Sequence, residues 1–117
     1  MTVGPAEVRQ ALERIRGRVR RTPVIEVAVD ERRLTLKLEL LQHTGSFKPR
    51  GAFNRVLGAE VIPGAGIIAA SGGNHALAVA HVASELGLPA EVFVPEVSPG
   101  VNVNGEMVVT MLFPDPG

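Results

Sequence analysis

Apolar residues recur every three or four positions near the start of the chain. After Pro5 they stand at Val8, Leu12, Ile15 and Val19. This spacing places them on one face of a helix. Pro5 suits a first helical turn, because the backbone N–H that it lacks would have no partner there. The pattern predicts a helix that ends before Pro23, since the residue preceding a proline avoids the helical region.

Further along, alternation and turn residues predict strands and helices in succession. Leu34, Leu36, Leu38 and Leu40 alternate with polar residues, as in a half-buried strand. A helix over 45–57, a strand over 66–70, a helix over 76–86 and a strand over 90–94 follow. This order predicts an α/β fold, in which parallel βαβ units pack helices against a sheet.

The composition is that of a globular domain. The 117 residues are 45% hydrophobic and 21% charged, which is typical of a folded chain and not of a disordered one. The absence of cysteine excludes disulfides, thiolate metal sites and cysteine nucleophiles. No apolar run approaches the ~20 residues of a membrane span, and no apolar leader is visible. We therefore expect a soluble, cytoplasmic protein that does not bind membranes.

Charge is distributed unevenly along the chain. Residues 1–55 hold all twelve basic residues and six acidic ones, for a net charge of +6, and residues 56–117 hold six acidic residues, for −6. Several arginines lie off the apolar stripe of the first helix. Such a face either binds nucleic-acid phosphates or keeps the helix soluble. No aromatic residue lies among these arginines, so we favour the solvated face and expect no nucleic-acid partner.

Lys48 is the first candidate for chemistry. It is one of only two lysines, with Lys37, and it lies near the start of the predicted helix over 45–57. The positive end of the helix dipole and the nearby Arg50 both disfavour a protonated amine there. A neutral amine is the form that Schiff-base chemistry requires. The alternative is an exposed lysine at a helix start with no role.

The turn Ser71-Gly72-Gly73-Asn74-His75 is the second candidate. It joins a predicted strand to a predicted helix, and its glycines would let backbone N–H groups approach an anion at the helix start. Asn74 and His75 add side-chain hydrogen-bonding groups. The pattern fits a phosphate or carboxylate site about as well as an ordinary turn, in which Ser71 or Asn74 caps the helix. It is neither of the standard dinucleotide and nucleotide fingerprints.

Other polar residues indicate no further chemistry. The three histidines, His43, His75 and His81, lack the spacing of metal ligands, so no metal site is predicted. His81, within an apolar helix, is interpreted as a structural residue with satisfied hydrogen bonds, and Glu39 as an ordinary strand carboxylate. No G-x-S-x-G segment surrounds a serine, which argues against a serine hydrolase.

Two ordered motifs resemble one enzyme family. Residues 21–23 (RTP), 36–42 (LKLELLQ) and 44–52 (TGSFKPRGA) resemble the N-terminal region of fold-type II pyridoxal-phosphate enzymes. Residues 69–76 (AASGGNHA) are similar to the second motif of the threonine/serine dehydratase branch, which includes serine racemase. The resemblance covers about residues 5–99 and implies parallel-sheet βαβ units like those of the tryptophan synthase β chain.

The resemblance implies pyridoxal 5'-phosphate as the cofactor and assigns roles to seven residues. Lys48 would form the Schiff base with the cofactor and move the substrate α-proton, with Phe47 near the cofactor ring. Asn74 would bind the ring hydroxyl. The substrate carboxylate would be held by Ser71, Gly72, Gly73, Asn74 and His75. The implied reaction is β-elimination from L-threonine or L-serine, which yields a 2-oxo acid and ammonia.

Gly72 departs from the racemases of the branch, which have a serine at that position. Glycine cannot protonate the opposite face of the substrate, so the departure favours elimination over racemisation.

The extent of the resemblance divides the chain into three segments. Residues 1–65 would belong to the large cofactor domain, residues 66–99 to the start of the small domain, and residues 100–117 to a tail that does not match. The family's glycine-rich phosphate loop lies later than this sequence reaches. We therefore expect the truncated N-terminal portion of a dehydratase, inactive as this short chain. The alternative is a non-catalytic module that pairs with a full-length relative, and a homo-oligomer is possible on either interpretation.

Overall fold

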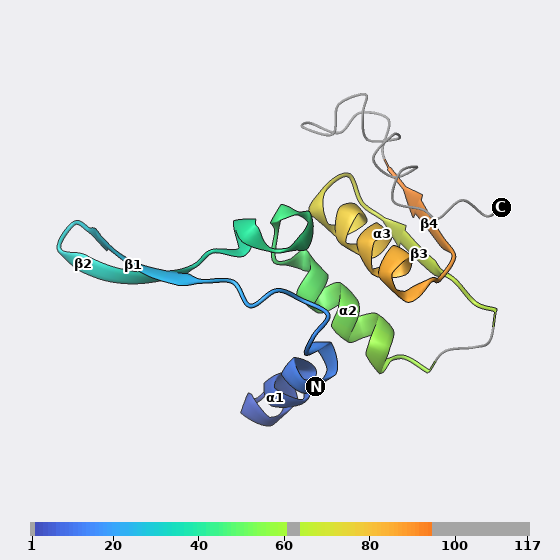
Figure 1. Ribbon diagram of the computed structural model, residues 1–117, viewed down its shortest axis with the longest axis horizontal. Coiled ribbons are helices and arrows are strands. Elements are labelled where there is room, and N and C mark those ends of the chain that lie inside the picture. Colours follow the sequence, from blue (N-terminus) through green and yellow to red (C-terminus); the bar gives the residue numbers. More distant parts are fainter. Residues whose placement is uncertain (1, 61–63, 95–117) are drawn as a thin grey trace.

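The computed structural model describes residues 2–60 and 64–94 (Figure 1). The predicted tail over residues 100–117 lies outside these ranges. In chain order the helices and strands are α1 (Pro5–Ile15), β1 (Val24–Val29), β2 (Arg32–Lys37), α2 (Lys48–Gly58), β3 (Ile67–Ala70), α3 (Asn74–Leu86) and β4 (Ala90–Phe93). Two short 3-10 turns, η1 (Glu39–Leu41) and η2 (His43–Gly45), lie between β2 and α2.

The predicted βαβ unit is present in the second half of the chain. Strands β3 and β4 pair in parallel, from Ile67 opposite Ala90 to Ala70 opposite Phe93, and α3 connects them. Helix α3 ends at Gly87, whose left-handed φ of 65° suits a glycine at a helix C-terminus. The α/β class predicted from the sequence is therefore confirmed.

The prediction for residues 34–40 was wrong in two respects. Strand β2 ends at Lys37 and pairs antiparallel with β1, in a hairpin separate from the parallel sheet. The hairpin projects away from the helices (Figure 1). Leu34 and Leu36 consequently remain 44% and 41% exposed, so the strand is not half-buried.

Strand β1, which the sequence analysis did not predict, depends on an unusual turn. Asp30 and Glu31 adopt φ values of 47° and 63°. Two consecutive positive φ angles are what a two-residue type I′ hairpin turn requires, and Asn-Gly or Asp-Gly usually supplies them. Because this turn contains no glycine, its sequence gives no ordinary hairpin signal.

The core lies where the three helices meet. Its buried members are Ile15, Ala52, Phe53, Ala78 and Val82. Phe53 of α2 is fully buried against α3 residues that are mostly small, and α2 and α3 lie side by side (Figure 1). The predicted helix at the N-terminus is confirmed as α1, but it ends at Ile15, so Val19 of the predicted apolar stripe lies outside it. Only Ile15 of the stripe is buried within α1. Val8 and Leu12 are 59% and 49% exposed.

A carboxylate joins the start of α2 to the segment before β1. Arg50 donates to Glu39 through Nε and Nη2, both at 2.9 Å, and Thr22 Oγ1 donates to the same carboxylate at 2.5 Å. Glu39 therefore lies in η1 and accepts several hydrogen bonds; it is not an ordinary strand carboxylate. The paired Arg50 guanidinium lowers the pKa of Glu39 to about 2. We call Glu39, Arg50 and Thr22, with the neighbouring Gln42, the Glu39 cluster.

Gln42 extends the Glu39 cluster to the backbone. Its side chain is almost completely buried, accepts from the Arg20 N–H at 2.9 Å and donates to the Arg20 carbonyl at 2.9 Å. Arg50 Nη2 also donates to that carbonyl, at 3.3 Å. The peptide groups around Arg20 are thereby held against both η1 and α2.

Replacing Glu39 by Gln should lower the free energy of unfolding by roughly 2–3 kcal/mol at neutral pH, because a mostly buried Arg50 loses its charged partner. The wild-type chain should also lose stability as the pH falls from about 4.5 toward 2. Folding lowers the pKa of Glu39, so its ionised carboxylate contributes fully to stability above the ordinary pKa of 4.5. This contribution is lost as the pH falls to the folded-state pKa of about 2. Urea unfolding at a series of pH values measures both effects.

Glu13→Gln is the matched control for this experiment. Glu13 pairs with Arg16 at 2.6 Å, but both side chains are about two-thirds exposed, so its loss should change the free energy of unfolding far less than the loss of Glu39. The role given to the cluster would be contradicted if the two substitutions lowered stability equally. It would also be contradicted if Glu39→Gln lost as much stability as the wild type between pH 4.5 and pH 2.

Candidate functional site

Lys48 stands at the first position of α2 with an accessible amine. Its side chain is exposed, and its Nζ lies 5.2 Å from the centroid of the Phe47 ring. Ser46 Oγ accepts a hydrogen bond from the Lys48 backbone N–H at 3.3 Å, which fixes the helix start. Within residues 2–60 and 64–94, no carboxylate lies within ion-pair distance of this amine. A ligand can therefore reach it without first displacing a counter-ion.

Lys37, the other lysine, is differently placed. Its Nζ donates to the Thr22 carbonyl at 3.1 Å and lies 3.8 Å from Glu39 Oε1. The Lys37 amine is therefore already engaged by two oxygen atoms. The two lysines thus differ in availability, although both are at least partly exposed.

The turn before α3 leaves the start of that helix open. The N-cap is Gly73, without a side-chain cap, so neither Ser71 nor Asn74 caps the helix as an ordinary turn would require. Ser71 Oγ instead accepts from the Gly73 N–H at 3.3 Å. Asn74 and His75 are the first helical residues and are exposed. Uncapped N–H groups at a helix start are the donors that a carboxylate or phosphate requires.

The two candidate segments lie at one end of the helix pair. Helices α2 and α3 run in the same general direction, so their N-terminal ends lie near each other (Figure 1). Lys48 begins one helix, and Gly72 and Gly73 immediately precede the other. Among the described residues no hydrogen bond links the lysine segment to the turn. Their relative position is therefore set by the packing of the helices behind them.

A histidine pair contributes to this packing, and the sequence analysis missed it. The His43 ring of η2 stacks on His81 of α3, with centroids 4.7 Å apart and planes at 26°. Phe53 of α2 meets His81 edge-on at 5.9 Å. The three rings connect the lysine segment to α3. Nothing in the spacing of the histidines along the sequence indicates this contact.

His81 is structural, as predicted, but its hydrogen bonds are not satisfied. Its buried Nε2 has no hydrogen-bond partner in the part of the chain that the structure describes. Burial lowers the pKa of His81, the positive charges of His43 and Arg20 lower it further, and Glu85 opposes them. The neutral imidazole is therefore the form that the packed helices favour.

Comparison with known proteins places these motifs in a family. The pyridoxal-phosphate dependent enzyme family matches residues 15–107, which include both candidate segments and extend past residue 99, where we expected the resemblance to end. The chain belongs to the pyridoxal-phosphate dependent enzyme family. The cofactor and the family predicted from the sequence are thus confirmed.

One curated relative is the L-threonine dehydratase catabolic TdcB of Staphylococcus aureus (strain USA300). It is 41% identical over 103 residues, which cover 83% of this chain and 30% of the relative. The corresponding protein of strain N315 is 40% identical over the same length. The chain therefore spans about a third of the length of these relatives.

Solved structures agree with the predicted fold-type II architecture. Maize serine racemase superposes with a TM-score of 0.79 at 30% identity, covering 96% of this chain and 35% of the racemase chain. A pyridoxal 5'-phosphate-dependent aspartate racemase superposes with a TM-score of 0.80 at 30% identity, covering 96% and 36%. Among the described residues, no helix is long and apolar enough to cross a membrane, and no group of three or more potential ligands could hold a metal ion.

The histidine pair predicts a pH dependence of stability. Because the pKa of His81 is lowered in the folded state, the unfolded chain binds the proton more readily. The contribution of neutral His81 to stability should be fully present above about pH 6.5, the ordinary histidine pKa, and should decrease below that pH. His81→Phe should reduce this loss while it retains an aromatic ring against His43 and Phe53. Thermal unfolding from pH 5 to pH 8 measures the effect.

His75→Phe is the control, since His75 is exposed at the start of α3. It should leave the slope of stability against pH between 5 and 7 unchanged. If the two variants change that slope equally, the His81 environment is not its source.

Proposed function

We propose that the chain is the N-terminal part of a pyridoxal-phosphate-dependent threonine/serine dehydratase, which eliminates the β-hydroxyl of L-threonine or L-serine to give a 2-oxo acid and ammonia. One observation carries the proposal. The accessible amine of Lys48 and the uncapped start of α3 lie at the same end of one helix pair (Figure 1). The relative named as an L-threonine dehydratase supports the substrate class.

The residues present fit a pyridoxal-phosphate ring. Lys48 offers an accessible amine, the 60% exposed Phe47 offers an apolar surface beside it, and a Cβ placed on Gly73 would meet no other atom within 4 Å. In the proposed site Lys48 and Phe47 hold the cofactor, with Asn74 donating to its ring hydroxyl. When bound, the cofactor supplies the electron sink for carbanion chemistry. The Lys48 amine takes the proton from the substrate α-carbon.

The turn before α3 binds the substrate carboxylate in this proposal. The contributing groups are Ser71, the Gly72 and Gly73 backbone, Asn74 and His75. Support comes from the uncapped N–H groups and from the dipole of a 13-residue helix, which favour a negative charge at this end. The carboxylate is thereby oriented so that the α-hydrogen faces Lys48.

Gly72 favours elimination over racemisation. The two solved structures named above are racemases, of serine and of aspartate, so the family match alone does not select the reaction. A glycine carries no side chain that could deliver a proton to the face opposite Lys48. We therefore propose that the substrate loses its β-hydroxyl and that the configuration at its α-carbon is not inverted.

Other features remain predictions of the sequence. These are the division into a large-domain segment (1–65) and a small-domain segment (66–99), a cytoplasmic location and a homo-oligomer. The resemblance implies a glycine-rich loop for the cofactor phosphate, and no such loop occurs among the 117 residues. We propose that the 117 residues alone bind the cofactor weakly and do not turn over threonine or serine.

Borohydride reduction of the chain with pyridoxal phosphate, followed by peptide mass mapping, tests the proposed site. Modification should fall on Lys48 in preference to Lys37, because the Lys37 amine already donates to the Thr22 carbonyl and lies beside Glu39. Lys48→Ala should abolish most of the labelling and Lys37→Ala should leave it. Equal modification of both lysines would contradict a preserved site and favour the alternative, a non-catalytic module that pairs with a full-length relative.

The role of Gly72 is testable in a full-length relative that carries glycine at the matching position. Replacing that glycine by serine should raise racemisation of L-serine by about a hundredfold, the lower end of the range for a positioned general acid. Alanine at the same position is the control, since it adds bulk without a proton. If serine brings no gain over alanine, the assignment of elimination to Gly72 is wrong.

A further inference from the structure

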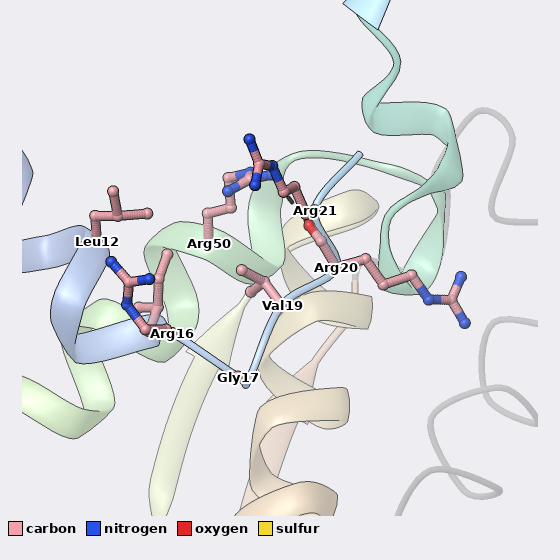
Figure 2. Close-up of a pocket in the computed structure, with 8 residues that line it drawn as sticks. Leu12, Arg16, Gly17, Val19, Arg20, Arg21 and Arg50 are labelled. Atoms are coloured by element: carbon pink, nitrogen blue, oxygen red, sulfur yellow. Dashed lines mark hydrogen bonds between the residues drawn. The ribbon is translucent and has the colours of Figure 1, made fainter. Parts of the chain in front are cut away.

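A pocket lies between α1, the segment that follows it and α2 (Figure 2). Its volume of about 390 Å³ is within the range of small-molecule sites. The residues that line it are Leu12, Ile15, Arg16, Gly17, Val19, Arg20, Arg21 and Arg50. Neither Lys48 nor the turn over residues 71–75 lines it, so the pocket is separate from the proposed cofactor site.

The lining divides into an apolar part and a cationic part. Leu12, Ile15 and Val19 supply carbon surface from the end of α1 and the segment after it. Arg16, Arg21 and Arg50 supply guanidinium groups, and the side chains of Arg21 and Arg50 extend toward each other in Figure 2. An apolar surface beside clustered guanidinium groups suits a ligand that has an anionic end and an apolar body.

Two of these cations are already paired, and one is not. Glu13 accepts from Arg16 at 2.6 Å, and Glu39 accepts from Arg50 at 2.9 Å. Arg20 donates to the Leu41 carbonyl at 3.1 Å, and its side chain points away from the pocket in Figure 2. Among the described residues no carboxylate lies within 4.0 Å of Arg21. The pocket therefore has an excess of positive charge, centred on Arg21.

We propose that this pocket binds a small organic anion, a phosphate or carboxylate group attached to an apolar body. The anion lies against the Arg21 guanidinium and the outer faces of Arg16 and Arg50. Planar guanidinium groups bind such oxyanions through paired N–H donors. The apolar body covers Leu12 and Val19. Leu12 is about half exposed, so covering it adds to the affinity.

Calorimetric titration of the 117-residue chain with phenyl phosphate, phenylacetate, inorganic phosphate and phenol tests the proposal. Phenyl phosphate or phenylacetate should bind saturably at one site, inorganic phosphate more weakly, and phenol without measurable heat. The first two probes distinguish phosphate from carboxylate as the preferred anion. Neither contains an aldehyde, so neither can react covalently with Lys48.

Arg21→Ala should weaken binding of the better probe by about fivefold or more, the effect of losing one charge-assisted hydrogen bond. Arg33→Ala on the hairpin is the matched control, because it also removes one positive charge, but at a position that does not line the pocket. It should change the affinity by less than about twofold, as expected for a distant screened charge. Equal losses in the two variants would show general attraction to the basic half of the chain and would overturn the site.

Glu13→Gln provides a test in the opposite direction. It releases Arg16 from its carboxylate partner and should tighten binding by roughly threefold. Glu26→Gln, on the exposed face of β1, carries the same charge change and should have little effect. Lys48→Ala should leave the affinity unchanged. Loss of binding in Lys48→Ala would assign the anion to the lysine site and overturn the proposal. Absence of binding by every probe would also overturn it, and would leave the proposed dehydratase function unaffected.

Discussion

The carboxylate of Glu39 is the contact on which the position of the lysine helix depends. Through Arg50 it holds the first turn of α2, and through Thr22 it holds the chain just before the hairpin. Its hydrogen bonds come from directions that no single helix or strand could supply. The desolvation cost of a mostly buried ion pair offsets much of its attraction. Its main consequence is therefore geometric, since it fixes where α2 begins.

The packing behind α2 determines where the second candidate segment lies. Phe53, Ala78 and Val82 are buried between α2 and α3, and the alanines of α3 allow the helices to approach closely. The stacked histidines add a contact between η2, which precedes Lys48 in the chain, and α3. In this arrangement the amine and the uncapped helix start belong to two separately held helices. The distance and orientation between Lys48 and the start of α3 are thus set by how the two helices pack, and not by the loops that precede them.

The sequence predicted the features that depend on local periodicity and missed those that depend on tertiary contacts. Helix α1, helix α3 and the parallel strands followed from apolar spacing. Both candidate segments were recognised because glycines and a lysine have distinct chemistry at helix starts. The role of Glu39 could not be predicted, because the fold brings Arg50 and Thr22 to it. The same holds for His81, whose stacking partner His43 comes from another element.

The projecting hairpin has a consequence for how the chain opens. Its strands pair with each other, and its side chains are almost all exposed, so few tertiary contacts oppose its separation from the helices. An isolated two-stranded hairpin has only marginal stability in water. Its amide hydrogens can therefore exchange with solvent through local opening, while those of α2 and α3 exchange only when the helix core unfolds. We therefore expect the hairpin and the helix core to open as separate units, with the Glu39 cluster at the junction between them.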